Sequence, residues 1–465
     1  MFELLPSLRH GLNPHLDRAI WPLSAYVDEQ GRLCVGGVAV TELAAEFGTP
    51  TYVVDEEDFR ARIRCYRAAL PGVELVYAGK ALLSAAVAGW AAVEGAGVDV
   101  CSGGELATAL AGEVPPSQII LNGNAKTAGE LHDAVAAGVG RIVIDSPSEI
   151  ALLAGRVRRR QSVLIRVIPD IEAGGHRAVS AGVLDQKFGF ALAGGQAAGA
   201  VKRVLDQPWL NLVGLHCQLG SQLTDAGLYG EAIRQMMALM AEVRDRHQVV
   251  LTELNLGGGH AVPYISGDPE FSPRALAAVI DAALRSACAE YSYPRPQIVI
   301  EPGRAIAARA GMTLYRVIAI KHQPGGRTFV AVDGGMSDDP RVALYGAKYT
   351  VALANRHVPT ASAPVTVVGR HCEAGDEIAR DVKLPADIHP GDLMAVACTG
   401  AYHYSMGSSR NLVGRPPLVA VAGGRSRELV RRETVADLLA RDCGWSGQPH
   451  RDRASTAAIG ELSRE

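Results

Sequence analysis

The sequence lacks an excess of charge of either sign. It has 46 Lys and Arg against 49 Asp and Glu, for a net charge of −3. This balance argues against nucleic acid or a membrane surface as a partner. No charge-free apolar run reaches the roughly 20 residues that cross a bilayer. The start, "MFELLPSLRHGLNPHLDRAI", carries early charges where a signal peptide would have an apolar core. We therefore expect neither a membrane nor a nucleic-acid partner.

The sequence also lacks paired cysteines. Its eight cysteines are scattered and show no CxxC spacing. A reduced cytoplasmic protein is therefore expected rather than a disulfide scaffold or a zinc site. The final stretch, residues 446–465, is polar and rich in small residues, which predicts a flexible tail.

Most of the chain alternates short β-rich runs with Ala- and Leu-rich helical stretches. Eight strands and intervening helices between residues 51 and 311 favour an α/β fold, a (β/α)8 barrel, over an open doubly wound sheet, which remains the alternative. The eight expected strands are 74–79, 97–100, 118–121, 141–144, 163–168, 212–217, 251–256 and 297–301.

The pattern changes after the eighth strand. Residues 312–445 hold β runs separated by turns, such as "RTFVAVDGG", with little helical spacing. We expect a second, mainly β domain there, of a sandwich or barrel-like kind. Residues 1–50 precede the barrel, and their run at 33–40 is expected to lend a strand to that β domain.

Residues able to do chemistry gather at the ends of the expected strands. In a (β/α)8 barrel the C-terminal strand ends carry the active site. No cluster of His and Asp stands there, which argues against a metal-dependent hydrolase, and no metal is expected. The residues at these ends are Lys80, Asp99, the NGN at 122–124, the DS at 145–146, His216, the GGGH at 257–260 and the EPGR at 301–304.

Lys80, in "LVYAGKALLS", has two interpretations. It is either a solvated surface charge or a lysine in a pocket, where desolvation lowers its pKa and frees the amine to form a Schiff base. Pyridoxal phosphate needs such an amine, an anion cradle and a carboxylate that keeps its ring nitrogen protonated. The glycines at 257–259 could supply the cradle. Glu301 could supply the carboxylate, although an ion pair between Glu301 and Arg304 would be an alternative.

Ten motifs then carry a family resemblance over residues 30–435. They occur in the order found in the fold-type III pyridoxal-phosphate decarboxylases, and the sequence resembles the diaminopimelate decarboxylase family more than the ornithine and arginine decarboxylases. The resemblance implies a carboxy-lyase that converts meso-diaminopimelate to L-lysine and carbon dioxide. The motifs are YAGKAL, GVDVCSGGEL, NGNAK, KFGF, GLHCQLGSQ, LNLGGGHAVPY, EPGR, RVALYGAKY, GRHCEAGDEIARD and GAYHYSMGSSRN.

The resemblance also implies residue roles. Lys80 would form the Schiff base, Glu301 would face the ring nitrogen, and Cys372 would be a proton donor contributed by the partner subunit of a homodimer. The implied cofactor-binding residues are Lys80, His216, Gln218, Ser221, Gly257, Gly258, Gly259, Glu301, Gly303, Arg304 and Tyr402. The implied substrate-binding residues are Arg304, Arg341, Tyr345, Glu373 and Tyr402.

Some positions depart from the family pattern. Gln218 replaces a histidine that stacks on the cofactor ring, and Ala374 replaces a serine near the distal end of the substrate. These two changes indicate either drift or an altered substrate. The remaining departures are Asn122 and Ala125 in place of His and Asn, His260 in place of an apolar or aromatic residue, and Arg410 in place of Tyr, of which Asn122 and Arg410 are interpreted as drift.

Other functions remain as alternatives. A diverged paralogue would decarboxylate ornithine, lysine, arginine or a substrate of specialised metabolism. A non-catalytic regulator that binds the cofactor is disfavoured because Lys80, Cys372 and the second domain are all present. An alanine racemase would place an arginine at the ring nitrogen, so Glu301 argues against racemisation.

Overall fold

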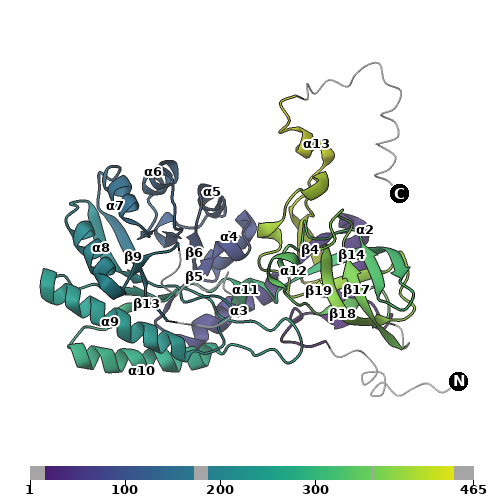
Figure 1. Cartoon of the computed structure of the whole chain (residues 1–465), viewed down its shortest axis with the longest axis horizontal. Coiled ribbons are helices and arrows are strands. Elements are labelled where there is room, and N and C mark those ends of the chain that lie inside the picture. Colours follow the sequence, from purple (N-terminus) through teal and green to yellow (C-terminus); the bar gives the residue numbers. More distant parts are fainter. Residues whose placement is uncertain (1–15, 172–186, 358–360, 445–465) are drawn as a thin grey trace.

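The computed structural model describes residues 16–171, 187–357 and 361–444. The tail expected at 446–465 lies outside these residues. Two bodies are visible in Figure 1, a barrel ringed by helices and a β-rich domain beside it. None of the helices in the described ranges is long and apolar enough to cross a membrane.

The barrel has eight parallel strands and is closed. Strand β8 pairs with β9, and β13 returns to pair with β5, so the open-sheet alternative is excluded. The predicted (β/α)8 barrel is therefore confirmed. Its strands are β5 (Glu74–Ala78), β6 (Gly97–Val100), β7 (Ile119–Leu121), β8 (Arg141–Ile144), β9 (Gln161–Ile168), β11 (Leu210–His216), β12 (Glu253–Asn255) and β13 (Gln297–Ile300).

Buried apolar side chains fill the barrel. One small cluster inside it joins five strands and is separate from the main core, as expected for the layered interior of this fold. Because both faces of each strand are covered, the strands read as continuous apolar runs, and the sequence pattern located all eight. The inner cluster consists of Val76, Ile120, Val143, Leu164 and Val299.

Most of the barrel helices that follow these strands have a capped start. Five of these helices begin after a Ser or Thr whose side-chain oxygen accepts a hydrogen bond from the backbone three residues on, which stabilises the helix start by about 1 kcal/mol. The caps and helices are Ser84 for α4 (Ala85–Val93), Ser102 for α5 (Gly103–Ala111), Thr127 for α6 (Ala128–Ala137), Ser146 for α7 (Pro147–Ala154) and Ser272 for α10 (Pro273–Tyr291). Helices α8 (Gln196–Leu205) and α9 (Gly227–His247) complete the ring.

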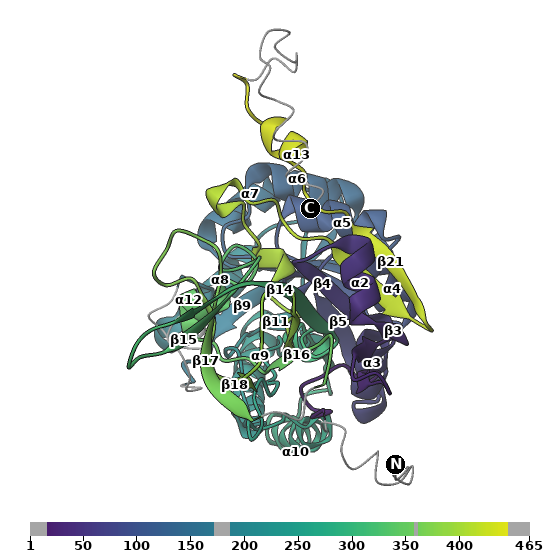
Figure 2. The same cartoon turned by 90° about the vertical axis from the view of Figure 1, so that its right-hand side faces the viewer.

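The β-rich domain follows the barrel and faces the viewer in Figure 2. Its sheet runs in the order β18-β17-β15-β14-β4-β20-β21, and β19 pairs with both β14 and β16. The strands are β4 (Thr51–Asp55), β14 (Gly311–His322), β15 (Thr328–Val332), β16 (Val351–Leu353), β17 (Ser362–Val368), β18 (Glu377–Pro385), β19 (Leu393–Ala397), β20 (Leu418–Ala422) and β21 (Arg425–Val430).

The strand that the N-terminal region contributes differs from the expected one. The run at 33–40 forms β2 (Leu33–Val35) and β3 (Val38–Ala39) of a separate small sheet with β1 (Tyr26–Val27), then enters α2 (Val40–Phe47). It is β4 that joins the β domain, pairing with β14 and β20. Gly36 and Gly37 turn the chain between β2 and β3, both at positive φ, so the run is a hairpin rather than one strand.

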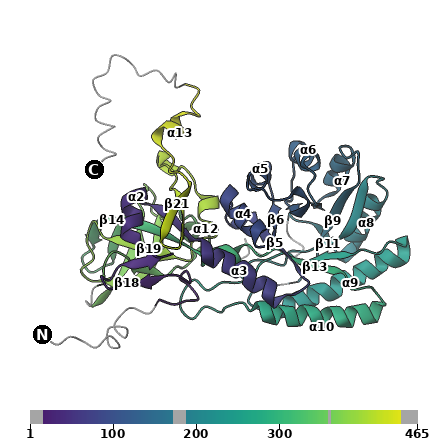
Figure 3. The ribbon, with the colours of Figure 1, turned by 180° about the vertical axis from the view of Figure 1, so that it is seen from behind.

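Helix α3 (Glu56–Ala69) connects the two bodies. It starts directly after β4, where the Asp55 carboxylate accepts hydrogen bonds from the first helical N–H groups. Figure 3 shows α3 passing from the β domain to the barrel. From β4 in the β domain the chain therefore crosses into the barrel and returns after β13, which sets the C-terminal strand ends against the second domain.

Candidate active site

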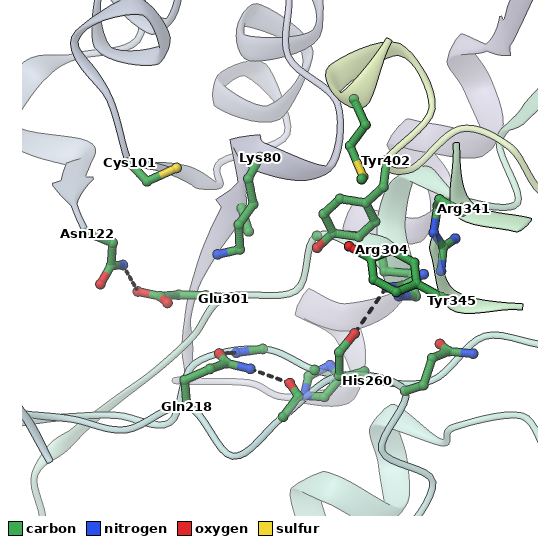
Figure 4. Close-up of a pocket in the computed structure, with 18 of the residues that line it drawn as sticks. Lys80, Cys101, Asn122, Gln218, His260, Glu301, Arg304, Arg341, Tyr345 and Tyr402 are labelled. Carbon is green, nitrogen blue, oxygen red and sulfur yellow. Dashed lines mark hydrogen bonds between the residues drawn. The ribbon is translucent and has the colours of Figure 1, made fainter. Parts of the chain in front are cut away.

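A pocket of about 730 Å³ lies at the C-terminal ends of the barrel strands. Its walls come from both bodies, because residues of the β domain complete the side opposite the strand ends (Figure 4). Pockets of this size hold a small cofactor together with a substrate. The β-domain residues that line it are Arg341, Tyr345, Ala347, Lys348, Tyr402 and Met406.

Lys80 stands in this pocket on a single 3-10 turn after β5. Its Nζ lies 3.1 Å from Oδ2 of Asp99, which is buried on β6. Desolvation would lower the pKa of Lys80, but the carboxylate of Asp99, with Tyr402 and Glu301, outweighs it and raises the pKa. The expected lowering by desolvation is therefore wrong for the chain without cofactor. The amine is a charged group held by a carboxylate, and covalent capture would have to displace its proton.

Glu301 follows β13 and is almost fully buried. Its Oε1 accepts hydrogen bonds from the amides of Asn255 at 2.7 Å and Asn122 at 3.1 Å, and His216 Nε2 lies 3.2 Å from its Oε2. Burial by itself would raise the pKa of Glu301, but His216, Lys80 and Asn255 lower it to about 2. The side chain is therefore a carboxylate throughout the neutral range, which suits a partner for a protonated ring nitrogen.

Asn122 has a larger part in the site than its interpretation as drift allowed. One amide nitrogen of Asn122 donates to Asp99 Oδ1 at 2.7 Å and to Glu301 Oε1 at 3.1 Å. Asn122 thereby links the carboxylate of Asp99 to the carboxylate of Glu301. A hydrogen bond donated to a carboxylate favours its ionised form, so Asn122 favours the ionised form of both. Its place in the strand-end motif NGN was the available signal. Asn255, two residues before the glycine run, was missed altogether.

The glycine run 257–259 packs so closely that no side chain fits. A Cβ at position 257 would lie 2.3 Å from Gln218 Oε1, one at 258 would lie 2.2 Å from the Glu301 carbonyl, and one at 259 would lie 2.4 Å from the Gly220 carbonyl. Gly257 and Gly259 also have positive φ. Gly303, across the pocket, is similarly enclosed, with Ala78 3.0 Å from its would-be Cβ. These loops therefore present bare backbone to their surroundings, as an anion cradle would require.

Gln218 joins the two loops of the cradle. Its Oε1 accepts from the Gly258 N–H at 2.8 Å, and its Nε2 donates to the Gly220 carbonyl at 2.5 Å. The side chain also lines the pocket. An amide makes both contacts at once, and it holds them at every pH because it does not titrate. Gln218 is therefore a bridge between loops rather than a proton carrier.

Arg304 places a cation beside the cradle. It donates to the hydroxyls of Ser221, at 3.1 Å, and Tyr264. Its guanidinium lies 4.7 Å from the ring centre of Tyr402, which comes from the β domain. Tyr402 has a φ of 64°, an uncommon value outside glycine, and its N–H donates to the Ala81 carbonyl at 2.8 Å. This hydrogen bond from Tyr402 attaches the β domain to Ala81, the residue that follows Lys80.

A second buried arginine faces the same pocket. Arg341 starts α12 (Arg341–Tyr345) and donates to the hydroxyls of Tyr264 and Tyr349, each at 2.9 Å. Tyr345, one helical turn later, also lines the pocket. Two guanidinium groups around one tyrosine hydroxyl make this side of the pocket suitable for anionic groups such as phosphate and carboxylate.

His260 belongs to the packing beneath the cradle. Its ring is stacked between Phe271, at 4.5 Å, and Tyr66, at 5.5 Å, and the Tyr66 hydroxyl lies 2.9 Å from its Nδ1. Burial lowers the pKa of His260 to about 3. The ring therefore stays neutral and acts as one layer of an aromatic stack, the place that an aromatic residue would otherwise take.

Cys372 and Glu373 lie apart from the pocket of their own chain. Both are exposed, neither is among the described residues that line the pocket, and Glu373 forms an ion pair with Arg410. Ala374 is exposed beside them. A single chain therefore brings together the barrel residues, Arg341, Tyr345 and Tyr402, but not the loop that carries Cys372.

Comparison with known proteins identifies the family. The family model described as pyridoxal-dependent decarboxylase, pyridoxal binding domain, matches residues 56–308. The chain belongs to the pyridoxal-dependent decarboxylases. Over 440 residues it is 52% identical to a diaminopimelate decarboxylase of Actinosynnema pretiosum subsp. auranticum, covering 95% of this chain and 99% of that one. A second relative is the diaminopimelate decarboxylase of Mycobacterium tuberculosis, 44% identical over 437 residues, covering 91% of this chain and 98% of that one.

Solved structures of pyridoxal-dependent decarboxylases agree with this assignment. The chain is similar to the crystal structure of diaminopimelate decarboxylase from M. jannaschii in complex with L-lysine, with a TM-score of 0.84 and 33% identity, covering 90% of this chain and 98% of that one. The family expectation is therefore confirmed, and the chain is a carboxy-lyase that uses pyridoxal phosphate. The cradle, the two arginines and the buried carboxylate of Glu301 fit this cofactor.

Proposed function

We propose that this decarboxylase converts meso-diaminopimelate to L-lysine and carbon dioxide. The observation that carries the proposal is the similarity to proteins named diaminopimelate decarboxylase, at 52% and 44% identity over more than nine-tenths of the chain. The pocket is compatible with such a substrate because it combines cationic and hydroxyl groups on one side with carboxylates on the other. The cytoplasmic location stays a prediction.

The proposed chemistry divides between the two sides of the pocket. When bound, pyridoxal phosphate supplies an electron sink for the pair left by the departing carboxylate. Glu301 would hold a proton at the ring nitrogen, because Asn122, Asn255 and His216 favour its ionised carboxylate. The amine of Lys80 would hold the cofactor and return a proton to the α-carbon, with Asp99 stabilising its charged form.

The side of the pocket that carries the arginines would bind the anionic groups, which are the cofactor phosphate and a substrate carboxylate. Ser221, Arg304 and the glycine run 257–259 would hold the phosphate, with Gly303, Gln218 and His216 shaping the cavity and Tyr402 reaching it from the β domain. Arg341 and Tyr345 would hold a substrate carboxylate, with a bidentate guanidinium giving orientation. Glu373, near the distal end of the substrate, would have to come from a second chain.

The substrate assignment is tested with purified protein, pyridoxal phosphate and a panel of amino acids. We expect carbon dioxide release from meso-diaminopimelate with a kcat/KM well above that for lysine, ornithine, arginine or glutamate. If diaminopimelate is inert while another amino acid turns over, the chain is a paralogue with another substrate, the alternative that the departures at Gln218 and Ala374 left open.

We further propose a two-fold homodimer in which each site is completed by the loop carrying Cys372 from the partner subunit. Support comes from the exposure of Cys372 and from the absence of Cys372 and Glu373 among the described residues that line the pocket of their own chain. An isologous interface would generate two identical shared sites.

The shared site predicts complementation between inactive variants. Lys80→Ala and Cys372→Ala should each be severely impaired, because each removes a proton-carrying group. After random subunit exchange, half the dimers are mixed and each holds one intact site of two, so activity should approach roughly a quarter of wild type. Activity that stays at the level of the separate variants, although mixed dimers are shown by differential tagging, would place both residues in the same chain's site.

A further inference from the structure

Arg341 and Tyr402 reach the pocket from two segments that are joined behind it by a buried ion pair. Asp339 lies two residues before Arg341, and His403 directly follows Tyr402. Nε2 of His403 is 3.2 Å from Oδ1 of Asp339, and the two side chains are 0% and 1% exposed. Neither residue lines the pocket within the described part of the chain. The pair therefore connects the two pocket segments without facing the pocket.

The contacts of His403 leave its Nε2 facing the carboxylate of Asp339. Nδ1 of His403 lies 3.0 Å from the Ala401 carbonyl, which can only accept, so Nδ1 carries a hydrogen. A neutral ring would then turn the lone pair of Nε2 toward the Asp339 carboxylate. Among the residues that the structure describes, neither the oxygens of Asp339 nor Nε2 of His403 have a conventional hydrogen-bond partner, so the 3.2 Å approach is their contact with each other. Because an isolated buried carboxylate is strongly disfavoured, the imidazole of His403 is the neighbouring group placed to offset its charge.

Arg341 is the other cation near Asp339, but it makes its hydrogen bonds elsewhere. It donates to Tyr264 and Tyr349, and the ring of Tyr349 stands edge-on to His403 at 5.2 Å. Burial alone would lower the pKa of Arg341, but the hydroxyls of Tyr264 and Tyr349 and the carboxylate of Asp339 raise it. Asp339 thus acts on Arg341 electrostatically. Without His403, the unpaired carboxylate would attract this guanidinium away from the pocket.

We propose that His403 and Asp339 are positioning residues, a charge-compensated anchor that keeps Arg341 turned toward the pocket and Tyr402 in place. The inference rests on the proposed role of Arg341 in holding a substrate carboxylate. Tyr402 depends on the same anchor because its backbone has a φ of 64°, which neighbouring contacts must maintain. One such contact is its bond to Ala81, and the pair at His403 is the other.

Three variants separate charge compensation from simple packing. H403Q leaves Asp339 buried without a cation. D339N removes the charge, and its amide can donate to a neutral His403, so the contact survives. The double variant H403Q/D339N pairs two amides. H389Q is the matched control, because His389 also lies near an aspartate of the β domain, 3.8 Å from Asp392, but is 61% exposed.

We expect H403Q to raise KM roughly 10- to 100-fold, the range for losing a hydrogen bond to a charged group, with kcat little changed. D339N, the double variant and H389Q should stay close to wild type. Titration of the apoenzymes with pyridoxal phosphate, followed by absorbance, should show weaker binding for H403Q alone. This titration needs no substrate, so it still tests the anchor if no amino acid on the panel turns over and the proposed function fails.

H403Q and D339N could instead raise KM and weaken cofactor binding equally, with additive effects in the double variant. That result would overturn the proposed anchor, because a loss of packing alone would produce it. Wild-type behaviour of H403Q would also overturn it. If H403Q fails to fold, the double variant H403Q/D339N becomes the test. If His403 compensates the charge of Asp339, the double variant should fold and bind pyridoxal phosphate, because it no longer carries that charge. A double variant that also fails to fold would contradict the proposal.

Discussion

Glu301→Gln should fold and bind pyridoxal phosphate, yet decarboxylate roughly 10²- to 10³-fold more slowly than wild type, the loss seen when one preorganised electrostatic group is removed. The amide keeps the size of the side chain and can still contact Asn122 and Asn255. It cannot hold a proton at the ring nitrogen, so the electron sink weakens. The measurement is kcat for carbon dioxide release at saturating cofactor and substrate.

Glu253→Gln is the matched control for Glu301→Gln. Glu253 is also buried at a barrel strand, but it starts β12 at the opposite end of the barrel, where it pairs with Arg141 at 2.8 Å. This variant should lose stability while its kcat stays near wild type. A Glu301→Gln enzyme with near-normal turnover, or a Glu253→Gln enzyme with the same loss of kcat, would mean that Glu301 has no special role.

Lys80→Ala should abolish measurable turnover, with a loss of roughly 10³-fold or more, because one substitution removes the covalent attachment and an acid–base group. Folding should be retained, since the side chain lines a pocket rather than the core. Asp99 loses its cation in this variant and should bind a proton more readily. Single-turnover carbon dioxide release and the absorbance of the bound cofactor measure the two losses separately.

Lys348→Ala is the comparison for Lys80→Ala, because Lys348 lines the same pocket from the β domain. It should keep the cofactor attached after borohydride reduction, whatever its kinetics. Retained attachment in Lys80→Ala, or its loss in Lys348→Ala, would show that the wrong lysine has been assigned.

The sequence predicted the barrel well because its strands are buried on both faces. Runs such as "VLIRVI" in β9 are apolar along most of their length, and each is followed by helical spacing, so strand type and order can be read locally. The N-terminal contribution to the β domain could not be read this way. "TYVVD" in β4 looks like a barrel strand, and only its pairing with β14, some 260 residues later, assigns it elsewhere.

In the candidate site, too, local sequence features could be predicted and contacts between distant segments could not. Residue type and strand-end position singled out Lys80, Glu301 and the glycine run. The network that sets their charges could not be predicted, since Asn122 joins Asp99 to Glu301 across separate strands and looked like drift in the sequence. The pKa of Lys80 was predicted in the wrong direction because a nearby carboxylate outweighs burial, and distances decide that balance.

The role of Lys80 is tested by locating the lysine to which the cofactor is covalently attached. The wild-type enzyme is loaded with pyridoxal phosphate, reduced with borohydride, digested and mapped by mass spectrometry. We expect one modified lysine, Lys80, in the peptide that contains "YAGKALL". A modification found instead on Lys348 or any other lysine would contradict this role of Lys80.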